Sequence, residues 1–118
     1  MSKIFVYGSL KRNKSAHGFL TEHKATFIKE AVTTPEYHIY SISWFPGMVM
    51  DETIQGGVRG EVYEVSDECL KQLDRYEGAP DLFRQEEITL VDGDTAIAYL
   101  FNQAFSEQRR IESGVWDG

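Results

Sequence analysis

The first stretch that could do chemistry is a glycine-containing turn near the N-terminus, Tyr7-Gly8-Ser9-Leu10. It follows the apolar run Ile4-Phe5-Val6, which is typical of a buried strand. Where such a strand breaks at Gly-Ser, exposed backbone N–H groups can converge on an anion, and Gly8 leaves room for close approach because it has no side chain. The pattern fits two structures, an anion-binding turn and a plain turn without a ligand.

The second candidate is Glu77, a carboxylate where the pattern calls for an apolar side chain. Leu70, Leu73 and Glu77 are spaced i, i+3 and i+7, so all three lie on one stripe of a helix. Burial and the negative end of the helix dipole would both raise the carboxyl pKa from its usual value of about 4.3. Such a group can take up and return protons near neutral pH. In the alternative, the helix ends earlier and Glu77 is solvated or paired with Arg75 or Arg84.

The helix that must position Glu77 has clear boundaries in the sequence. Ser66 is a good N-cap, and acidic residues follow in the first turn, where the helix dipole favours negative charge. Gly78 is well placed to end the helix, and Pro80 prevents its continuation. These signals predict a helix that begins after Ser66 and carries Glu77 in its last turn.

The other predicted elements are mostly strands. Apolar and β-branched runs predict them over about residues 3–7, 24–34, 37–42, 48–50, 58–65, 82–91 and 95–102. The last two join at Asp92-Gly93-Asp94, a strong hairpin signal, and a short helix is predicted over residues 16–22. We therefore expect one domain over residues 1–118, an α+β fold with a small mixed, mostly antiparallel β-barrel or curled sheet and one or two short helices.

The charge of the chain is negative but unevenly distributed. The net charge is −7, which argues against general nucleic-acid binding. Residues 1–30 carry six basic and two acidic side chains, a charge of +4, so the remaining residues carry −11. We expect the basic loop Lys11-Arg12-Asn13-Lys14 to be solvated, and steering of an anionic substrate is the alternative.

The sequence contains no run long enough for a membrane span or a signal peptide. Cys69 is the only cysteine, so no internal disulfide can form, and we expect it to be a small buried residue. We therefore expect a cytoplasmic protein that has neither a membrane nor a nucleic acid as partner, and no obligate protein partner is evident.

Several motifs, in order along the chain, resemble one known family. They are Val6-Tyr7-Gly8-Ser9-Leu10, the strand at residues 60–65, Leu73-Asp74-Arg75-Tyr76-Glu77-Gly78, Phe83-Arg84, the tyrosine-bearing strand Ala96-Ile97-Ala98-Tyr99, and the tail at residues 111–116. This order resembles the γ-glutamylcyclotransferase-like proteins, above all the γ-glutamylamine cyclotransferase branch and its small bacterial relatives. Ser9 is a departure, because that branch usually has Thr there.

The resemblance implies an enzyme that releases 5-oxoproline and a free amine from a γ-glutamyl amine or peptide. Glu77 would act as general acid and base, and the substrate's α-amine would attack its own γ-carbonyl. The turn would hold the α-carboxylate or the oxyanion. The substrate-binding residues implied are Tyr7, Gly8, Ser9, Leu10 and Tyr99. The reaction needs no metal and no cofactor.

Other functions remain open from the sequence. Some bacterial relatives keep the turn without the glutamate, so a module of the same fold that binds a small carboxylate without chemistry is the main alternative. A serine hydrolase built on Ser9 with His17, His23 or His38 fits less well, because Gly-x-Ser-x-Gly is not present. No histidine pair is spaced for metal binding. The leaving amine depends on loops around residues 43–56 and 78–84 and is not identified.

Overall fold

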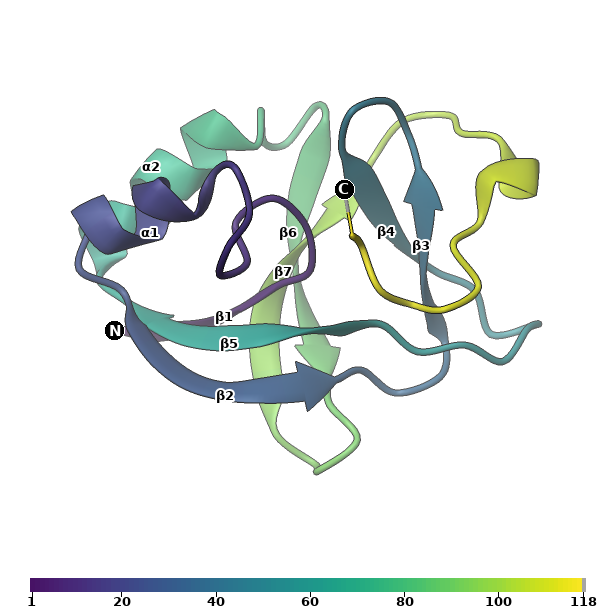
Figure 1. Cartoon of the computed structure of the whole chain (residues 1–118), viewed down its shortest axis with the longest axis horizontal. Helices are drawn as coiled ribbons and strands as arrows, with labels where there is room; N and C mark the ends of the chain where they lie inside the picture. Colours follow the sequence, from purple (N-terminus) through teal and green to yellow (C-terminus); the bar gives the residue numbers. More distant parts are fainter. Residues whose placement is uncertain (118) are drawn as a thin grey trace.

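Seven strands and two α-helices make up residues 1–117, the part of the chain that a computed structural model describes (Figure 1). The strands are β1 (Ser2–Val6), β2 (Thr26–Val32), β3 (Tyr37–Ser41), β4 (Pro46–Met50), β5 (Arg59–Val65), β6 (Phe83–Thr89) and β7 (Thr95–Phe101). The helices are α1 (His17–Glu22) and α2 (Asp67–Tyr76), and a 3-10 turn, η1, covers Glu107–Arg109. All predicted elements are present, with ends that differ by one or two residues.

Strand β7 is the centre of the sheet because it pairs with three other strands. β6 pairs with it in the antiparallel direction along its whole length. β1 pairs with it at Ile97 and β4 at Leu100, both in the parallel direction. Since β6 pairs along one edge of β7, β1 and β4 both pair with the other edge. They do so at different positions and diverge from each other there.

The strand order is β2-β5-β1-β7-β4-β3, with β6 beside β7. Four of the six pairings are antiparallel, which confirms the α+β class and the mixed, mostly antiparallel sheet. The strands of residues 1–117 do not close into a barrel in this pairing. The chain after β2 meets the end of β6 through an isolated antiparallel bridge between Thr33 and Leu90, which is not a strand pairing.

The predicted hairpin between β6 and β7 forms at Asp92-Gly93-Asp94. Gly93 has a φ of 93°, a conformation that glycine adopts without strain. The Leu90 N–H donates to the Asp94 carbonyl at 2.8 Å and closes the turn. Lys29 of β2 forms ion pairs with the carboxylates of both Asp92 and Asp94, so the hairpin end is also attached to β2.

The hydrophobic core divides into two clusters, and β1 contributes to both because its side chains alternate between the faces of the sheet. Ile4 and Val6 pack with Leu20 of α1 and Leu73 of α2. Phe5, one residue along, packs in the second cluster against strands β3, β4, β5 and β7. The end of β1 therefore lies where the two clusters meet.

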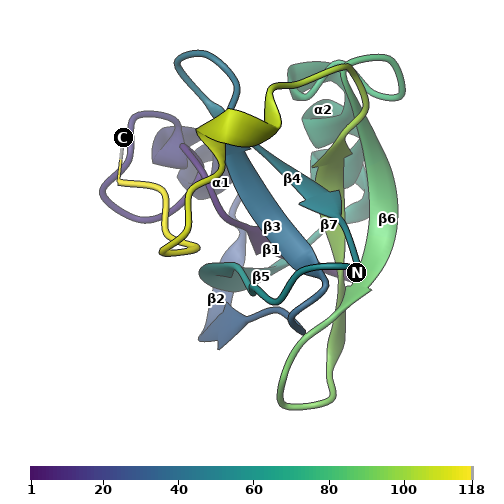
Figure 2. The ribbon, with the colours of Figure 1, turned by 90° about the vertical axis from the view of Figure 1, so that its right-hand side faces the viewer.

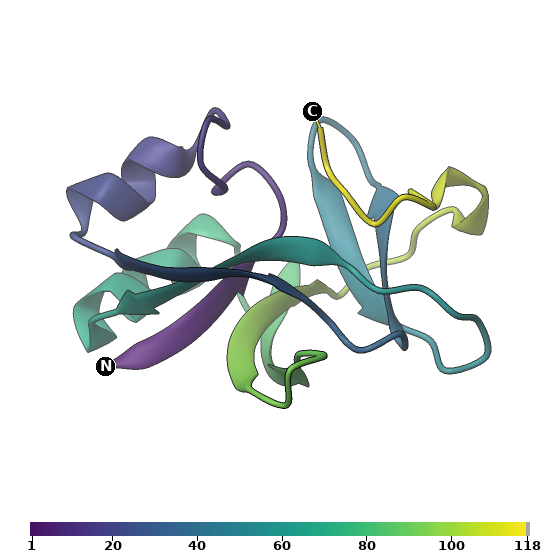
Figure 3. The same cartoon turned by 60° about the horizontal axis from the view of Figure 1, so that its bottom comes forward.

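The helices and the β3–β4 hairpin lie at opposite ends of the molecule, as two views agree (Figures 1 and 3). The segment after η1 passes over β3, where Tyr40 and Arg110 form an isolated bridge (Figure 2). Among residues 1–117, no helix is both long and apolar enough to cross a membrane.

The basic loop after β1 is exposed at Arg12 and Asn13, as expected, but its two lysines bond to the C-terminal tail. Lys11 is buried, and its Nζ donates to the Trp116 carbonyl at 2.9 Å. Lys14 Nζ donates to the Asp117 carbonyl, also at 2.9 Å. Arg12 lies over the Phe27 ring, 4.2 Å from its centroid. The C-terminal tail folds back onto this loop and engages both lysines, so their charges are occupied within the protein.

Candidate active site

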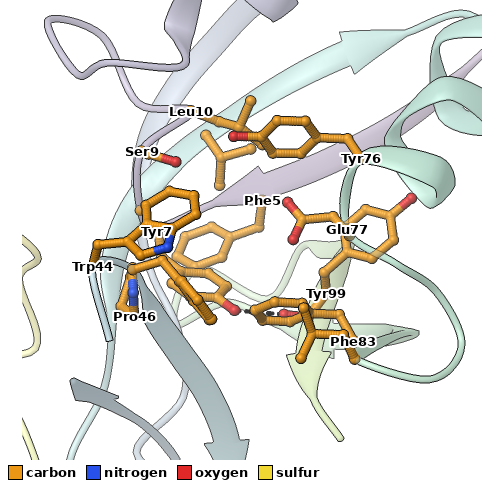
Figure 4. Close-up of a pocket in the computed structure, with 14 residues that line it drawn as sticks. Phe5, Tyr7, Ser9, Leu10, Trp44, Pro46, Tyr76, Glu77, Phe83 and Tyr99 are labelled. Atoms are coloured by element: carbon orange, nitrogen blue, oxygen red, sulfur yellow. Dashed lines mark hydrogen bonds between the residues drawn. The ribbon is translucent and has the colours of Figure 1, made fainter. Parts of the chain in front are cut away.

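A cavity of about 160 Å³ opens between the turn after β1 and the end of α2 (Figure 4). Elements from five parts of the chain surround it. Its lining residues are Phe5, Val6, Tyr7, Gly8, Ser9, Leu10, Trp44, Phe45, Pro46, Tyr76, Glu77, Leu82, Phe83 and Tyr99. All six residues singled out from the sequence are among them, so the fold brings the turn and Glu77 to one cavity across some seventy residues of chain.

The end of α2 holds Glu77 through a well-defined capping motif. Ser66 caps the start of the helix by accepting the Cys69 N–H at 3.0 Å, as predicted. At the other end, the Ala79 N–H donates to the Asp74 carbonyl at 2.9 Å, and Gly78 has a φ of 64°. This is the Schellman arrangement, in which a glycine beyond the last helical residue satisfies the final carbonyls. Glu77 is thereby fixed as the C-cap residue.

The Glu77 carboxylate points into the cavity (Figure 4). It is the one charged group among the fourteen lining residues, and within residues 1–117 it has no ion-pair partner. Arg84, which could have neutralised it, pairs with Glu86 at 2.9 Å instead. Burial raises the pKa of Glu77 from its usual value near 4.5 to about 7. The carboxyl can therefore change protonation state at neutral pH.

The turn faces Glu77 with unused backbone donors. The carbonyls of Gly8 and Ser9 accept the N–H groups of Lys11 and Ala16 at 3.1 and 2.9 Å. The N–H groups of Gly8, Ser9 and Leu10 donate to no acceptor within residues 1–117. These three N–H groups therefore have no protein acceptor, which is a condition for binding an anion at this turn.

The need for glycine at position 8 has a cause that sequence reasoning did not find. A Cβ built on Gly8 would lie 2.9 Å from Cγ of Pro46, the first residue of β4. Real Cβ atoms do not approach so closely, so a side chain here would push the turn and β4 apart. Close packing of the turn on Pro46 is therefore a structural reason for Gly8, separate from any ligand.

Glu61 of β5 is a further residue of this region, and its role was not predicted. It is buried, and its Oε1 accepts both the Arg12 backbone N–H and the Tyr63 hydroxyl at 2.9 Å. The Arg12 side chain adds a longer contact to Oε2, 3.4 Å from Nε. Glu61 therefore anchors the loop that follows the turn at residues 7–10. The signal available in the sequence was a glutamate that shares one face of the predicted strand with Tyr63 and Val65.

Tyr7 presents its ring to the cavity while its hydroxyl holds strands together. The hydroxyl donates to the Tyr99 carbonyl at 2.5 Å (Figure 4). It also accepts the Met48 N–H at 3.1 Å. The Tyr7 hydroxyl thus lies between β1 and β4, where both strands pair with the same edge of β7. Burial and the nearby charge of Glu77 raise the pKa of this hydroxyl well above its usual range, so it stays protonated.

The hydroxyl of Tyr99 is likewise engaged by protein groups. It donates to Asp74 Oδ1 at 2.6 Å and accepts from Gln85 Nε2 at 3.3 Å. Burial, and then the hydrogen bond to Asp74, raise the pKa of Tyr99 above its usual range. Because Asp74 precedes Glu77 by one helical turn, this contact ties the C-terminal end of α2 to β7.

The three histidines do not line the cavity. A ring nitrogen of each lies within hydrogen-bond distance of a backbone carbonyl: His17 at Leu10, His23 at Phe19 and His38 at Asp51. The serine hydrolase alternative lacks its base beside Ser9. A search of residues 1–117 also finds no group of three or more His, Cys, Asp or Glu side chains placed to hold a metal ion.

Known proteins resemble the chain over its whole length. The family described as "Gamma-glutamyl cyclotransferase, AIG2-like" matches residues 4–118. A Vibrio cholerae protein, whose name assigns it provisionally to the γ-glutamylcyclotransferases, is 34% identical over 113 residues that cover 96% of this chain and 93% of the relative.

Solved structures of other proteins also resemble the fold of this chain over nearly its whole length. The solution structure of ytfP from Escherichia coli matches with a TM-score of 0.75 and 30% identity, over 98% of this chain and 96% of ytfP. A mouse AIG2-like protein has a TM-score of 0.78 over 99% of this chain and 88% of its own, and at 23% identity it shows the common fold. The resemblance noted in the sequence is thus confirmed, and the chain belongs to the AIG2-like γ-glutamyl cyclotransferase family.

Proposed function

We propose that the protein is a γ-glutamylcyclotransferase that converts a γ-glutamyl amine or peptide to 5-oxoproline and a free amine. The single observation that carries this proposal is the Glu77 carboxyl, with a pKa of about 7, directed into a cavity whose opposite wall offers free backbone N–H groups. Family membership supports the reaction class.

The turn would bind the negative charge of the substrate. The N–H groups of Gly8, Ser9 and Leu10, which have no protein acceptor, would donate to the α-carboxylate or to the oxyanion that forms at the γ-carbon. The Ser9 hydroxyl lies beside them (Figure 4). The rings of Tyr7 and Tyr99 would form the wall against which the folded γ-glutamyl chain rests. In this way the turn fixes one end of the substrate while Glu77 meets its amine.

Glu77 would act first as the general base and then as the general acid of the reaction. Its carboxylate takes a proton from the α-ammonium, whose usual pKa is about 8, so a base with a pKa of about 7 is matched to it within roughly 1.4 kcal/mol. The free amine attacks the γ-carbonyl, a C–N bond forms, and a five-membered ring closes. Protonated Glu77 then gives its proton to the departing nitrogen as the original amide C–N bond breaks, and the extra proton on the new ring nitrogen passes to the released amine or to water.

The experiment is release of 5-oxoproline by the purified protein from a panel of γ-glutamyl amines and dipeptides. Because γ-glutamyl compounds can cyclise without a catalyst, each substrate is also incubated with no protein. We expect release above that background from at least one substrate, with amine and 5-oxoproline formed in equal amounts. Binding without release by every member of the panel would instead favour a module that binds small carboxylates.

A further inference from the structure

The mouth of the cavity is formed by large apolar side chains that are unusually exposed. Trp44 is 74% exposed, Tyr76 43% and Leu82 38%, yet all three line the cavity. They belong to two separate segments, the β3–β4 connection and the end of α2 with the chain that follows it. Apolar side chains gathered in the open at the edge of a cavity are typical of a binding surface rather than of a core.

Aromatic neighbours fix the orientation of the two exposed rings, Trp44 and Tyr76. The Trp44 ring packs edge-on against Phe45 with centroids 5.1 Å apart, and Phe45 packs on Phe83 at 6.0 Å. Across the mouth, the Tyr76 ring lies 5.3 Å from Phe19 of α1. These aromatic contacts make the mouth a built surface, because each exposed ring rests on a neighbour that fixes its orientation.

The side chains that line the mouth, within residues 1–117, carry no charge that could meet a charged ligand. Glu77 is the one charged lining residue, and the proposed reaction uses it at the inner end with the α-amine. A carboxylate or ammonium on the leaving half would lose water among Trp44, Tyr76 and Leu82 without gaining an ionic partner, which disfavours it. An apolar group would bury these same surfaces favourably.

We infer that the amine released is uncharged beyond its reacting nitrogen and carries an aromatic or branched aliphatic group, which lies between Trp44, Tyr76 and Leu82. This inference rests on the proposed function, since it concerns only the part of the substrate beyond the γ-carbonyl. It excludes glycine, lysine and polyamines as the preferred leaving groups, because each places a charge in or near the mouth.

The test compares kcat/KM for four γ-glutamyl amides that share the glutamyl half: the benzylamide, the methylamide, the glycine conjugate and the putrescine conjugate. We expect the benzylamide to exceed the glycine and putrescine conjugates by about tenfold or more. Equal or faster turnover of a charged conjugate would overturn the inference and leave the proposed function standing. No release from any of the four would contradict both, and binding is then measured directly.

Two variants test whether the mouth of the cavity causes the preference for the benzylamide. Trp44→Ala should lower the benzylamide-to-methylamide ratio of kcat/KM about tenfold, because the lost contact serves only the larger group. Phe105→Ala is the matched control, since Phe105 is an exposed aromatic residue that packs on Tyr40, outside the cavity. An unchanged ratio in Trp44→Ala would overturn the inference.

Binding of the benzylamide gives a second measurement that does not depend on turnover. In a Glu77→Gln background, the benzylamide should quench tryptophan emission more strongly than the methylamide, because its ring lies against Trp44. Adding Trp44→Ala should abolish this difference, since the other tryptophan, Trp116, lies outside the cavity. Equal quenching by the two amides would contradict the inference even if neither is turned over.

Discussion

Two glutamates flank the N-terminal turn in opposite environments. Glu61 is 8% exposed, and its carboxylate receives donors from the Arg12 backbone and from Tyr63. Glu77 borders the cavity, and no group within residues 1–117 donates a hydrogen bond to its side chain or forms an ion pair with it. A carboxylate with its donors in place holds structure together, whereas a desolvated one without them keeps its proton to higher pH. The difference separates an anchoring carboxylate from one that is available for proton transfer.

The largest expected effect comes from removing the charge at Glu77. Glu77→Gln keeps the shape of the side chain but cannot accept a proton, so kcat for 5-oxoproline release should fall by about 10²–10⁴-fold. KM should change much less. Glu87→Gln, an exposed glutamate on β6, is the matched control and should retain full activity. Full activity in Glu77→Gln would remove Glu77 from the mechanism.

The same variant should show a pH-dependent gain in stability. Because burial raises the Glu77 pKa from near 4.5 to about 7, the folded state keeps this proton after the unfolded state has lost it. The stabilisation is complete below pH 4.5 and is lost as the pH rises through 7. Between pH 4.5 and 8, the free energy of unfolding of Glu77→Gln should therefore rise by about 3 kcal/mol relative to wild type. Urea unfolding at both pH values measures this, and a difference independent of pH would contradict it.

Glu61→Gln should have the opposite profile, with a loss of stability as its main effect. The charge-assisted hydrogen bonds to Arg12 and Tyr63 weaken, which should lower the free energy of unfolding by about 1–3 kcal/mol. Activity should fall less than in Glu77→Gln, because only the anchor of the turn is loosened. Glu64→Gln on the same strand serves as the control, because the Glu64 side chain makes no hydrogen bond within residues 1–117. If Glu61→Gln were as stable as wild type, the anchoring role would be wrong.

The part of the site that could be predicted from the sequence depends on local signals. The stripe that carries Leu73 and Glu77, the cap at Ser66 and the glycine at position 78 lie within one helix, and neighbouring residues set that geometry. The turn at Gly8 could be predicted for the same reason, since a buried strand ends directly before it.

What could not be predicted depends on contacts between distant parts of the chain. The Tyr7 hydroxyl meets a carbonyl 92 residues away, and Lys11 meets one 105 residues away. The Tyr7 contact means that a residue expected to bind substrate also joins three strands. The Lys11 contact attaches the C-terminal tail to a loop that was expected to be solvated. Neither partner is a side chain, so residue type alone carries no signal for them.

The smallest expected effect concerns Tyr99. Tyr99→Phe removes the hydroxyl that bonds to Asp74, which should lower the free energy of unfolding by about 1 kcal/mol. Because this hydroxyl is already engaged by Asp74 and Gln85, kcat should fall by less than about tenfold, as expected for a residue that positions α2. A hundredfold loss, with the fold intact, would show that the hydroxyl acts on the substrate itself.

The most direct test of the contrast between the two glutamates is a titration of the Glu77 side chain by NMR, which needs no substrate. The ¹³C resonance of its carboxyl, assigned by its absence in Glu77→Gln, should titrate with a pKa of about 7. A pKa near the ordinary value of about 4.5 would mean that the carboxylate is well solvated. That result would contradict its role as the group that moves protons in the cavity.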